Sequence, residues 1–399
     1  MDGPSPPAVA TWVIFLAVAD SQAAIVLSGG GARAAYQVGF LRHLVTRFPQ
    51  LDPGILTGVS AGGIIAAHLA SRTGSVRDSV SDLSRMWENL QIEDVFRVDP
   101  RDLATRVTRW GFRLVSGGVA PSQRMRSLVD TEPLRTLLTR TLAPDDDGRL
   151  PAIAASLAAG RLDALALTAS SYTSGQSVTW VQTGEGCGRL KADGSYDPRP
   201  NGTIRVEHVM ASSALPFFFP AVEVDGSWYG DGGIRLTAPL MPAIQLGARR
   251  IVAVTTRYSR PADENAAPGN SRYPPPAQVA GVLLNAIFLD SLDGDASRLE
   301  QINQLIDRLP PEQRHGLRKI DLLVLRPSRD LGRLANEFEA ALPRGFRFLV
   351  RGLGSRETRA NDMLSLLMFQ PDYIGRLIEL GEEDARARAA DIDAFLARG

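Results

Sequence analysis

The sequence predicts an α/β fold in which a mainly parallel sheet is covered by helices. Two observations in the first 70 residues carry this prediction. The apolar run 23–27 is followed by three glycines and then by apolar residues at helical spacing up to Phe48. A second short apolar run, 55–59, leads at once into the small, apolar stretch 61–70. Two strand-to-helix steps so close together are typical of a parallel sheet with helices on its faces.

The rest of the chain extends this pattern. Apolar residues three or four apart indicate helices, short apolar runs between turn residues indicate strands, and a proline-rich stretch indicates a linker. In chain order the expected elements are helices within 79–142, strands at 164–169 and 177–182 joined by a hairpin turn, a strand pair at 221–229 bent at Asp225-Gly226, a strand at 250–255, the linker 259–276, further helices, a strand at 320–325 and a polar closing helix from Glu382 to Leu396.

Composition and charge exclude several classes of function. Hydrophobic residues make up 44% of the 399 residues and charged residues 22%, as in ordinary globular proteins. Basic and acidic residues balance at 44 each, so no net charge favours nucleic acid as a partner. Cys187 is the single cysteine, which excludes an intrachain disulfide and cysteine-based metal sites. Because the four histidines also lack metal-binding spacing, we expect no catalytic metal.

The N-terminal segment 1–22 allows several interpretations. Its apolar run, 8–19, is shorter than the roughly 20 residues that a transmembrane helix needs. The run has the length of a signal-peptide core and ends in Ala17-Val18-Ala19, but no Lys or Arg precedes it. A buried strand or a start placed too far upstream explains it as well. We therefore expect a cytoplasmic protein, with export as the less favoured alternative.

The pentapeptide Gly58-Val59-Ser60-Ala61-Gly62 fits the pattern G-x-S-x-G. Small flanking residues let a strand turn sharply into a helix, which pushes the serine hydroxyl into the open. An apolar strand precedes Ser60 and an alanine-rich helix follows it, so helix N–H groups favour negative charge beside it. Ser60 is therefore a candidate nucleophile. A glycine-rich turn with a capping serine is the alternative.

The glycines directly after the first predicted strand form a second candidate site. Gly29, Gly30 and Gly31 let successive backbone N–H groups converge on an oxyanion. Gly29, Gly31 and Ala34 also match a dinucleotide fingerprint, with Asp52 near the position of its ribose-binding acid. That acid should end the second strand, whereas Asp52 precedes this strand. We therefore favour the oxyanion loop.

A serine nucleophile needs a base that takes its proton. Asp231 is the best candidate, because it follows a predicted strand and its neighbouring glycines allow the carboxylate to approach another loop closely. A plain turn aspartate is the alternative. His315, in a polar loop, could complete a triad in the order Ser60, Asp231, His315 known from α/β-hydrolases. Three other histidines fall within predicted helices or an apolar stretch: His43, His68 and His208.

Together these motifs resemble those of the patatin-like phospholipase family. That family has a glycine-rich oxyanion loop, a G-x-S-x-G serine and a later D-G-G or D-G-A aspartate in this order. One departure is Ala34, where the family often has glycine. The resemblance covers about residues 23–240. The matching residues are Gly29-Gly30-Gly31-Ala32-Arg33, Gly58 to Gly62, Asp231-Gly232-Gly233 and the Ala-Ser-Ser-Ala-Leu-Pro stretch at 211–216.

The resemblance implies a three-layer α/β/α catalytic domain over 23–258 and, after the linker, a mostly helical C-terminal region over 277–399 packed on it. It also implies a Ser60–Asp231 dyad instead of a triad. Arg33 would either steer a lipid phosphate or pair with a carboxylate. The remaining implied site residues are the oxyanion donors Gly29, Gly30, Gly31 and Ala61 and the motif-supporting glycines Gly58, Gly62, Gly232 and Gly233.

The implied activity is hydrolysis of fatty acyl esters in phospholipid or lysophospholipid, without a metal or cofactor. The alternatives are a carboxylesterase or thioesterase with a His315 triad and a non-catalytic lipid-binding protein. Phe217 to Phe219 could line an acyl pocket, although a core role is more common. Two segments, 101–113 and 364–369, are candidates for peripheral membrane contact, but a solvated face and buried core are favoured for them. The sequence predicts no oligomeric state.

Overall fold

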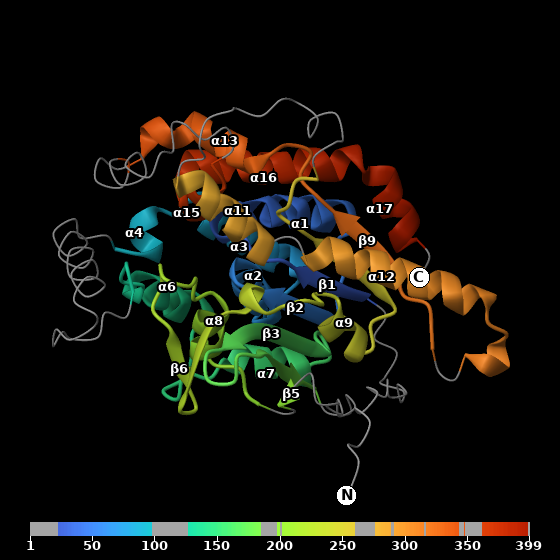
Figure 1. Cartoon of the computed structure of the whole chain (residues 1–399). Helices are drawn as coiled ribbons and strands as arrows, with labels where there is room; N and C mark the ends of the chain where they lie inside the picture. Colours follow the sequence, from blue (N-terminus) through green and yellow to red (C-terminus); the bar gives the residue numbers. More distant parts are fainter. Residues whose placement is uncertain are drawn as a thin grey trace, which may run out of the picture.

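The computed structural model describes residues 23–97, 127–184, 198–199, 202–259, 276–288, 291–314, 317–342, 347 and 361–397. In this part of the chain a nine-stranded sheet runs through the middle of the molecule, with helices around it (Figure 1). The strands are β1 Ala23–Leu27, β2 Ile55–Val59, β3 Ala164–Ser171, β4 Ser177–Thr183, β5 Pro198–Arg199, β6 Val222–Val224, β7 Ser227–Asp231, β8 Arg250–Val254 and β9 Asp321–Leu325.

The sheet is mainly parallel, as predicted. Its order is β5-β4-β3-β2-β1-β8-β9, and the five strands from β3 to β9 in this order are all parallel. The predicted hairpin joins β3 to β4, which is antiparallel to it. The predicted strand pair with its bend at Asp225-Gly226 is the hairpin β6–β7, and β7 returns antiparallel to the end of β3. The carboxyl ends of β1, β2 and β8 therefore meet at one edge, where α/β proteins bind ligands.

Helices cover both faces of this sheet, so the three-layer α/β/α architecture is confirmed. Those in the described part of the chain are α1 Ala35–Arg47, α2 Ala61–Ala70, α3 Val76–Glu88, α4 Ile92–Val95, α6 Glu132–Leu142, α7 Pro151–Ala158, α8 Val206–Ser212, α9 Met241–Gln245, α11 Pro276–Phe288, α12 Ser291–Arg308, α13 Leu331–Phe338, α15 Asp362–Leu367, α16 Pro371–Ala387 and α17 Ala389–Leu396, with the 3-10 turns η1 Gly31–Ala34, η2 Gly232–Ile234, η3 Pro311–Gln313 and η4 Glu339–Ala341.

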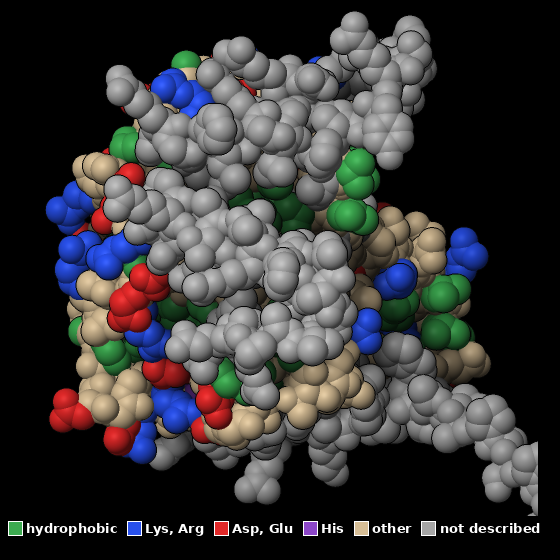
Figure 2. All heavy atoms as spheres, turned by 60° about the vertical axis from the view of Figure 1, so that its left-hand side comes forward, with side chains coloured by type: hydrophobic (Ala, Val, Ile, Leu, Met, Phe, Trp, Pro, Cys, Tyr) green, Lys and Arg blue, Asp and Glu red, His purple; other side chains and the backbone are tan. Residues whose placement is uncertain are grey.

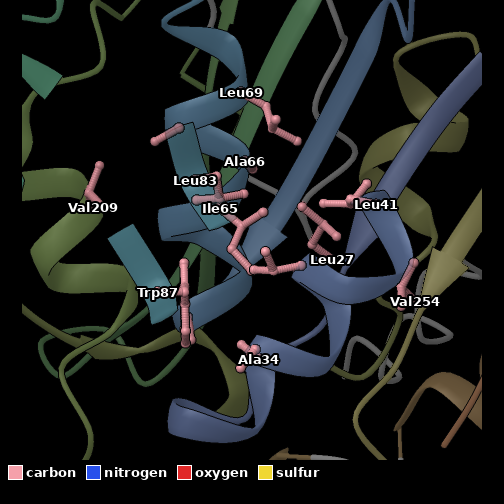
Figure 3. Packing of buried hydrophobic residues seen from close by; sticks show 14 of the residues in the cluster. Leu27, Ala34, Leu41, Ile65, Ala66, Leu69, Leu83, Trp87, Val209 and Val254 are labelled. Carbon is pink, nitrogen blue, oxygen red and sulfur yellow. The ribbon is translucent and has the colours of Figure 1, made fainter. Parts of the chain in front are cut away.

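The strands explain the two layers, because successive side chains point to opposite faces of a sheet. In β1, Ile25 and Leu27 join the larger core, whereas Ala24 and Val26 join a smaller one. The smaller core is closed by α9 and α12, and the larger core by most of the other helices. Figure 3 shows part of the larger core, in which Leu27 and Ile65 meet side chains from α1, α2 and α3.

The C-terminal part of the chain completes this architecture. Strand β9 adds to β8 at the edge of the sheet, and α16 packs along α1. The two helices cross at glycines: a β-carbon on Gly39 would lie 1.9 Å from the carbonyl oxygen of Ile378, and one on Gly381 would lie 2.2 Å from that of Tyr36. Such an approach excludes any side chain at either glycine. Helix α16 is therefore in close backbone contact with α1.

The closing helix differs from the prediction. It begins at Pro371, eleven residues before Glu382, and it is interrupted at Arg388 between α16 and α17. Its first turns bury apolar side chains against α1, which the polar appearance of the later residues concealed. Segment 364–369 is buried, as favoured. The segments 1–22, 101–113 and most of the predicted linker lie outside the described residues.

Candidate active site

Ser60 stands at the tight turn between β2 and α2. Its backbone has φ 56° and ψ −133°, a conformation that a residue with a side chain adopts at a cost of about 1–3 kcal/mol. The flanking glycines make the turn feasible. A β-carbon on Gly58 would lie 2.4 Å from the carbonyl oxygen of Gly62, and one on Gly62 would lie 2.4 Å from the carbonyl oxygens of Leu27 and Ser28. The G-x-S-x-G pattern thus has a steric cause at both glycines.

The segment after α8 fixes this turn and the aspartate together. The Ser60 N–H donates to the carbonyl oxygen of Ser212 at 3.1 Å, and the Ser212 hydroxyl donates to that of Thr168 at 2.7 Å. Two residues further along, the carbonyl oxygen of Ala214 accepts from the Asp231 N–H at 2.8 Å. The Ala-Ser-Ser-Ala-Leu-Pro stretch is therefore the bridge that holds the two motifs next to each other.

Asp231 ends β7 beside Ser60 and is fully buried. Its Oδ1 accepts a hydrogen bond of 2.9 Å from the N–H of Gly233. Burial raises the pKa of Asp231 to about 7, although the nearby Ser60 hydroxyl and the hydrogen bond from Gly233 act in the opposite direction. Its Oδ2 makes no hydrogen bond of ordinary geometry within the described structure, so the contact with the Ser60 hydroxyl is long or poorly aligned. Catalytic hydrogen bonds are often so before a substrate is bound.

The three glycines lie on the other side of Ser60. A β-carbon on Gly29 would be 3.0 Å from that of Ser60, so glycine is required for this approach. Gly30 and Gly31 have φ values of 148° and 53°, which favour glycine. Within the described part of the chain no acceptor takes a hydrogen bond from the N–H groups of these three glycines or of Ala61. Of these four backbone donors, those of Gly30, Gly31 and Ala61 belong to residues that line a pocket together with Ser60.

Two side chains that the sequence analysis missed hold the glycine loop. The Thr256 hydroxyl donates to the carbonyl oxygen of Gly29 at 2.9 Å, and the Gln37 amide donates to that of Ser28 at 2.7 Å. A signal for Thr256 was present, because it follows the predicted strand 250–255 and parallel strands end at the same edge. Gln37 gives no local signal, since it lies within an otherwise apolar part of α1.

Arg33 takes the second of its two predicted roles and pairs with a carboxylate. Its side chain is 3% exposed, and its Nη2 lies 2.7 Å from Oδ1 of Asp362 in α15. Its Nε donates to the Ser365 hydroxyl and its Nη1 to Oδ1 of Asn285 at 3.2 Å. The guanidinium group therefore ties the turn after the glycine loop to α15 and α11.

An apolar pocket opens beside Ser60. The space between its walls, together with the open solvent at its mouth, is about 710 Å³. Figure 2 views the molecule from the side of α4 and α6, where hydrophobic side chains lie recessed among charged ones. Phe219 lines the pocket, the less common of the two roles considered for these phenylalanines. Phe218 packs against the core, and Phe217 is 84% exposed. The remaining lining residues are Gly30, Gly31, Ser60, Ala61, Ile64, Met86, Trp87, Leu90, Val95, Leu134, Leu137, Ser213, Leu215, Leu366, Leu367 and Phe369.

Two of the three described histidines make contacts with backbone groups of helices. His68 lies 3.2 Å from a backbone carbonyl of α3, and His208 accepts a backbone hydrogen bond at the start of α8. Burial lowers the pKa of His43, His68 and His208, the last to about 4. His315 lies outside the described residues. Asp231 is therefore the titratable group that the described structure brings to Ser60.

The dinucleotide alternative does not fit the structure. Asp52 forms an ion pair with Arg72, whose side chain is buried, and it precedes β2 instead of ending it. A ribose-binding acid would need to stand free at the carboxyl end of that strand. The turn there holds Ser60 instead.

The described residues contain neither a candidate metal site nor a membrane-spanning helix. No group of three or more His, Cys, Asp or Glu among them could hold a metal ion. Of the helices that the structure describes, none is long and apolar enough to cross a membrane. The chemistry visible in the described part of the site is that of a hydroxyl, a carboxyl group and backbone N–H groups.

The arrangement of a serine at a strained turn, a buried aspartate and a glycine loop defines an α/β protein with a serine-hydrolase-like site. A sequence profile of the patatin-like phospholipases matches residues 25–244, which is more than half of the chain. The chain belongs to the patatin-like phospholipase family, as its motifs predicted. That family consists of lipid acyl hydrolases. No curated protein matches the sequence.

Solved structures show weaker similarity. Human GIVD cytosolic phospholipase A2 is 11% identical with a TM-score of 0.47, covering 94% of this chain and 60% of that one. VipD from Legionella pneumophila is 12% identical with a TM-score of 0.33, covering 91% and 67%. The type III effector protein ExoU is 14% identical with a TM-score of 0.34, covering 93% and 53%. These values are too low for any property of those proteins to be transferred.

Proposed function

We propose that this chain is a phospholipase A or lysophospholipase that hydrolyses fatty acyl esters through a Ser60 acyl-enzyme. The observation that carries the proposal is the buried Asp231 carboxyl group next to the Ser60 hydroxyl, at the polar end of an apolar pocket. The apolar walls suit a fatty acyl chain, because apart from Ser60, Ser213 and two glycines all the lining side chains are hydrophobic.

In the first half of the reaction Ser60 Oγ attacks the ester carbonyl carbon while Asp231 takes the hydroxyl proton. A base whose pKa is about 7 is ionised in a large fraction of the molecules near neutral pH. It is still basic enough to hold the proton that it takes from the Ser60 hydroxyl. The oxyanion of the tetrahedral intermediate accepts hydrogen bonds from Gly30, Gly31 and Ala61. Removing one such donor in other enzymes costs about 3–4 kcal/mol.

The intermediate then loses its alcohol. The bond between the carbonyl carbon and the alcohol oxygen breaks, and Asp231 returns its proton to that oxygen. Water attacks the acyl-enzyme in the second half, Asp231 takes a proton from it, and the fatty acid leaves while Ser60 Oγ regains a proton. These steps need no metal or organic cofactor.

The decisive test is fatty acid release from phosphatidylcholine and lysophosphatidylcholine by the parent chain and by Ser60→Ala, Asp231→Asn and His315→Ala. We expect the first two variants to lower kcat by about 10³-fold to 10⁴-fold, since the residues act as a unit, and His315→Ala to keep parental activity. Asp295→Asn is a matched control, because Asp295 is a partly buried carboxyl group with a raised pKa in α12, on the other face of the sheet.

The other outcomes select the alternatives. If His315→Ala abolishes turnover while Asp231→Asn retains it, the chain is an esterase or thioesterase with a Ser60-Asp231-His315 triad. If the parent releases no acid from any phospholipid, short-chain ester or thioester, the chain is a lipid-binding protein that kept the fold.

A further inference from the structure

Helix α11 carries an apolar stripe that faces solvent. Val279, Val282 and Leu283 are 44%, 60% and 58% exposed, and Ala286 is exposed as well. Positions i, i+3, i+4 and i+7 lie on one face of a helix, so these side chains form one surface. No charged residue occurs between Pro276 and Phe288. A single exposed hydrophobic side chain is ordinary, but an uncharged helix face with several of them marks an interaction surface.

The opposite side of α11 is attached to the site. Gly281 is buried, and a β-carbon there would lie 3.1 Å from that of Asp362 in α15. Asn285 accepts the hydrogen bond from Arg33. Figure 1 shows α11 beside α15, and α15 in turn lines the pocket next to Ser60. The apolar stripe is therefore separated from the pocket by one helix.

A second exposed apolar group stands between two residues of the pocket wall. Phe217 is 84% exposed, while Leu215 and Phe219 on either side of it line the pocket. Its φ of 67° is unfavourable for a residue with a side chain. Its carbonyl oxygen accepts a hydrogen bond of 3.1 Å from the Leu128 N–H, which fixes the backbone there. The fold thus holds a large aromatic side chain in solvent next to the pocket.

We propose that the α11 stripe and Phe217 rest on the surface of a lipid bilayer and bring the pocket to its substrate. This inference rests on the proposed function. Apolar side chains on one helix face enter the boundary between headgroups and acyl chains. In the described part of the chain, only one helix, α15, lies between this stripe and the pocket proposed to receive the acyl chain. A few side chains are also too small a surface for a stable protein dimer, which buries about 20–30 residues on each side.

The test is vesicle binding of the full chain with Ser60→Ala, which prevents hydrolysis during the measurement. Val282→Asp together with Leu283→Asp should lower the partition coefficient onto phosphatidylcholine vesicles, measured by sedimentation, by about tenfold or more. The matched control is Ile302→Asp together with Leu305→Asp. These residues are 47% and 59% exposed on α12, which covers the other face of the sheet. The control should stay within twofold of the parent.

Folding is checked by the thermal unfolding midpoint, which should agree among the three proteins. The proposal is overturned if the parent does not bind vesicles, if both double variants lose binding equally, or if the α11 variant binds like the control. It is also overturned if light scattering shows a dimer that the α11 substitutions dissociate, because the stripe then contacts a second copy. Failure of the proposed function gives a different result: no ester is hydrolysed, while the difference between the two variants persists.

Discussion

Two buried carboxyl groups flank the glycine loop, and their surroundings are opposite. Asp362 meets the guanidinium of Arg33 at 2.7 Å, whereas Asp231 accepts from one N–H and faces one hydroxyl, with no charged group contributing to its pKa. A buried carboxylate with a cation serves structure, because each charge compensates the other. Burial without a cation raises the pKa of a carboxyl group, so that it can release and take up a proton near neutral pH. Burial alone therefore does not distinguish the two carboxyl groups; the presence or absence of a charged partner does.

The largest expected effect tests the ion pair between Asp362 and Arg33. Asp362→Ala should lower the free energy of unfolding by about 3–5 kcal/mol, because it leaves the Arg33 charge buried and uncompensated. Urea denaturation measures this change. The control is Asp307→Ala, whose ion pair with Lys319 is about half exposed and contributes about 0–1 kcal/mol. Equal losses in both variants would show that the buried pair has no special importance.

The next prediction concerns Asp231, whose substitution should raise the free energy of unfolding instead of lowering it. Its pKa is about 7 in the folded chain and 3.8 ordinarily, so between these values the folded state holds a proton that the unfolded state releases. Stability of the parent therefore falls as the pH rises from 4 to 7. Asp231→Asn removes this loss and should be more stable than the parent by up to about 4 kcal/mol at pH 8, but not at pH 4. A difference in unfolding free energy that does not change with pH would contradict the assignment.

The same carboxyl group should govern the pH dependence of activity. Because the base must be ionised, kcat/KM should rise about tenfold per pH unit up to a plateau above pH 7, and be about hundredfold lower at pH 5. The profile is measured with a short-chain ester that ionises at none of these pH values. Asp362→Asn should keep the profile, since Asp362 lies outside the lining of the pocket. A profile governed by a group near pH 4 would rule out the buried base.

Much of the arrangement around Ser60 and Asp231 could be predicted from the sequence, but little of the surroundings of Asp362. Ser60, Asp231 and the glycines have local steric or conformational reasons that appear as short motifs, and the apolar runs 23–27 and 55–59 define the strands that bring them to one edge. The Arg33–Asp362 pair joins residues 329 positions apart, so no local pattern reveals it. The α15 side chains that line the pocket are likewise far from Ser60 in the sequence. The apolar residues of α15 predict burial, but not which site they enclose.

The smallest expected effect concerns Ser60 itself. Its backbone conformation is open to glycine without strain, so Ser60→Gly should be more stable than Ser60→Ala by about 1 kcal/mol. This gain is what remains of the relieved strain after glycine's greater freedom in the unfolded chain is subtracted. Urea denaturation at one pH compares the two variants, which both lack the hydroxyl. If they are equally stable, the turn stores no strain. If glycine is more stable, the turn at Ser60 stores strain. Ser60 then lowers the stability of the fold, as Asp231 is predicted to do at pH 8, whereas the Arg33–Asp362 pair is predicted to raise it.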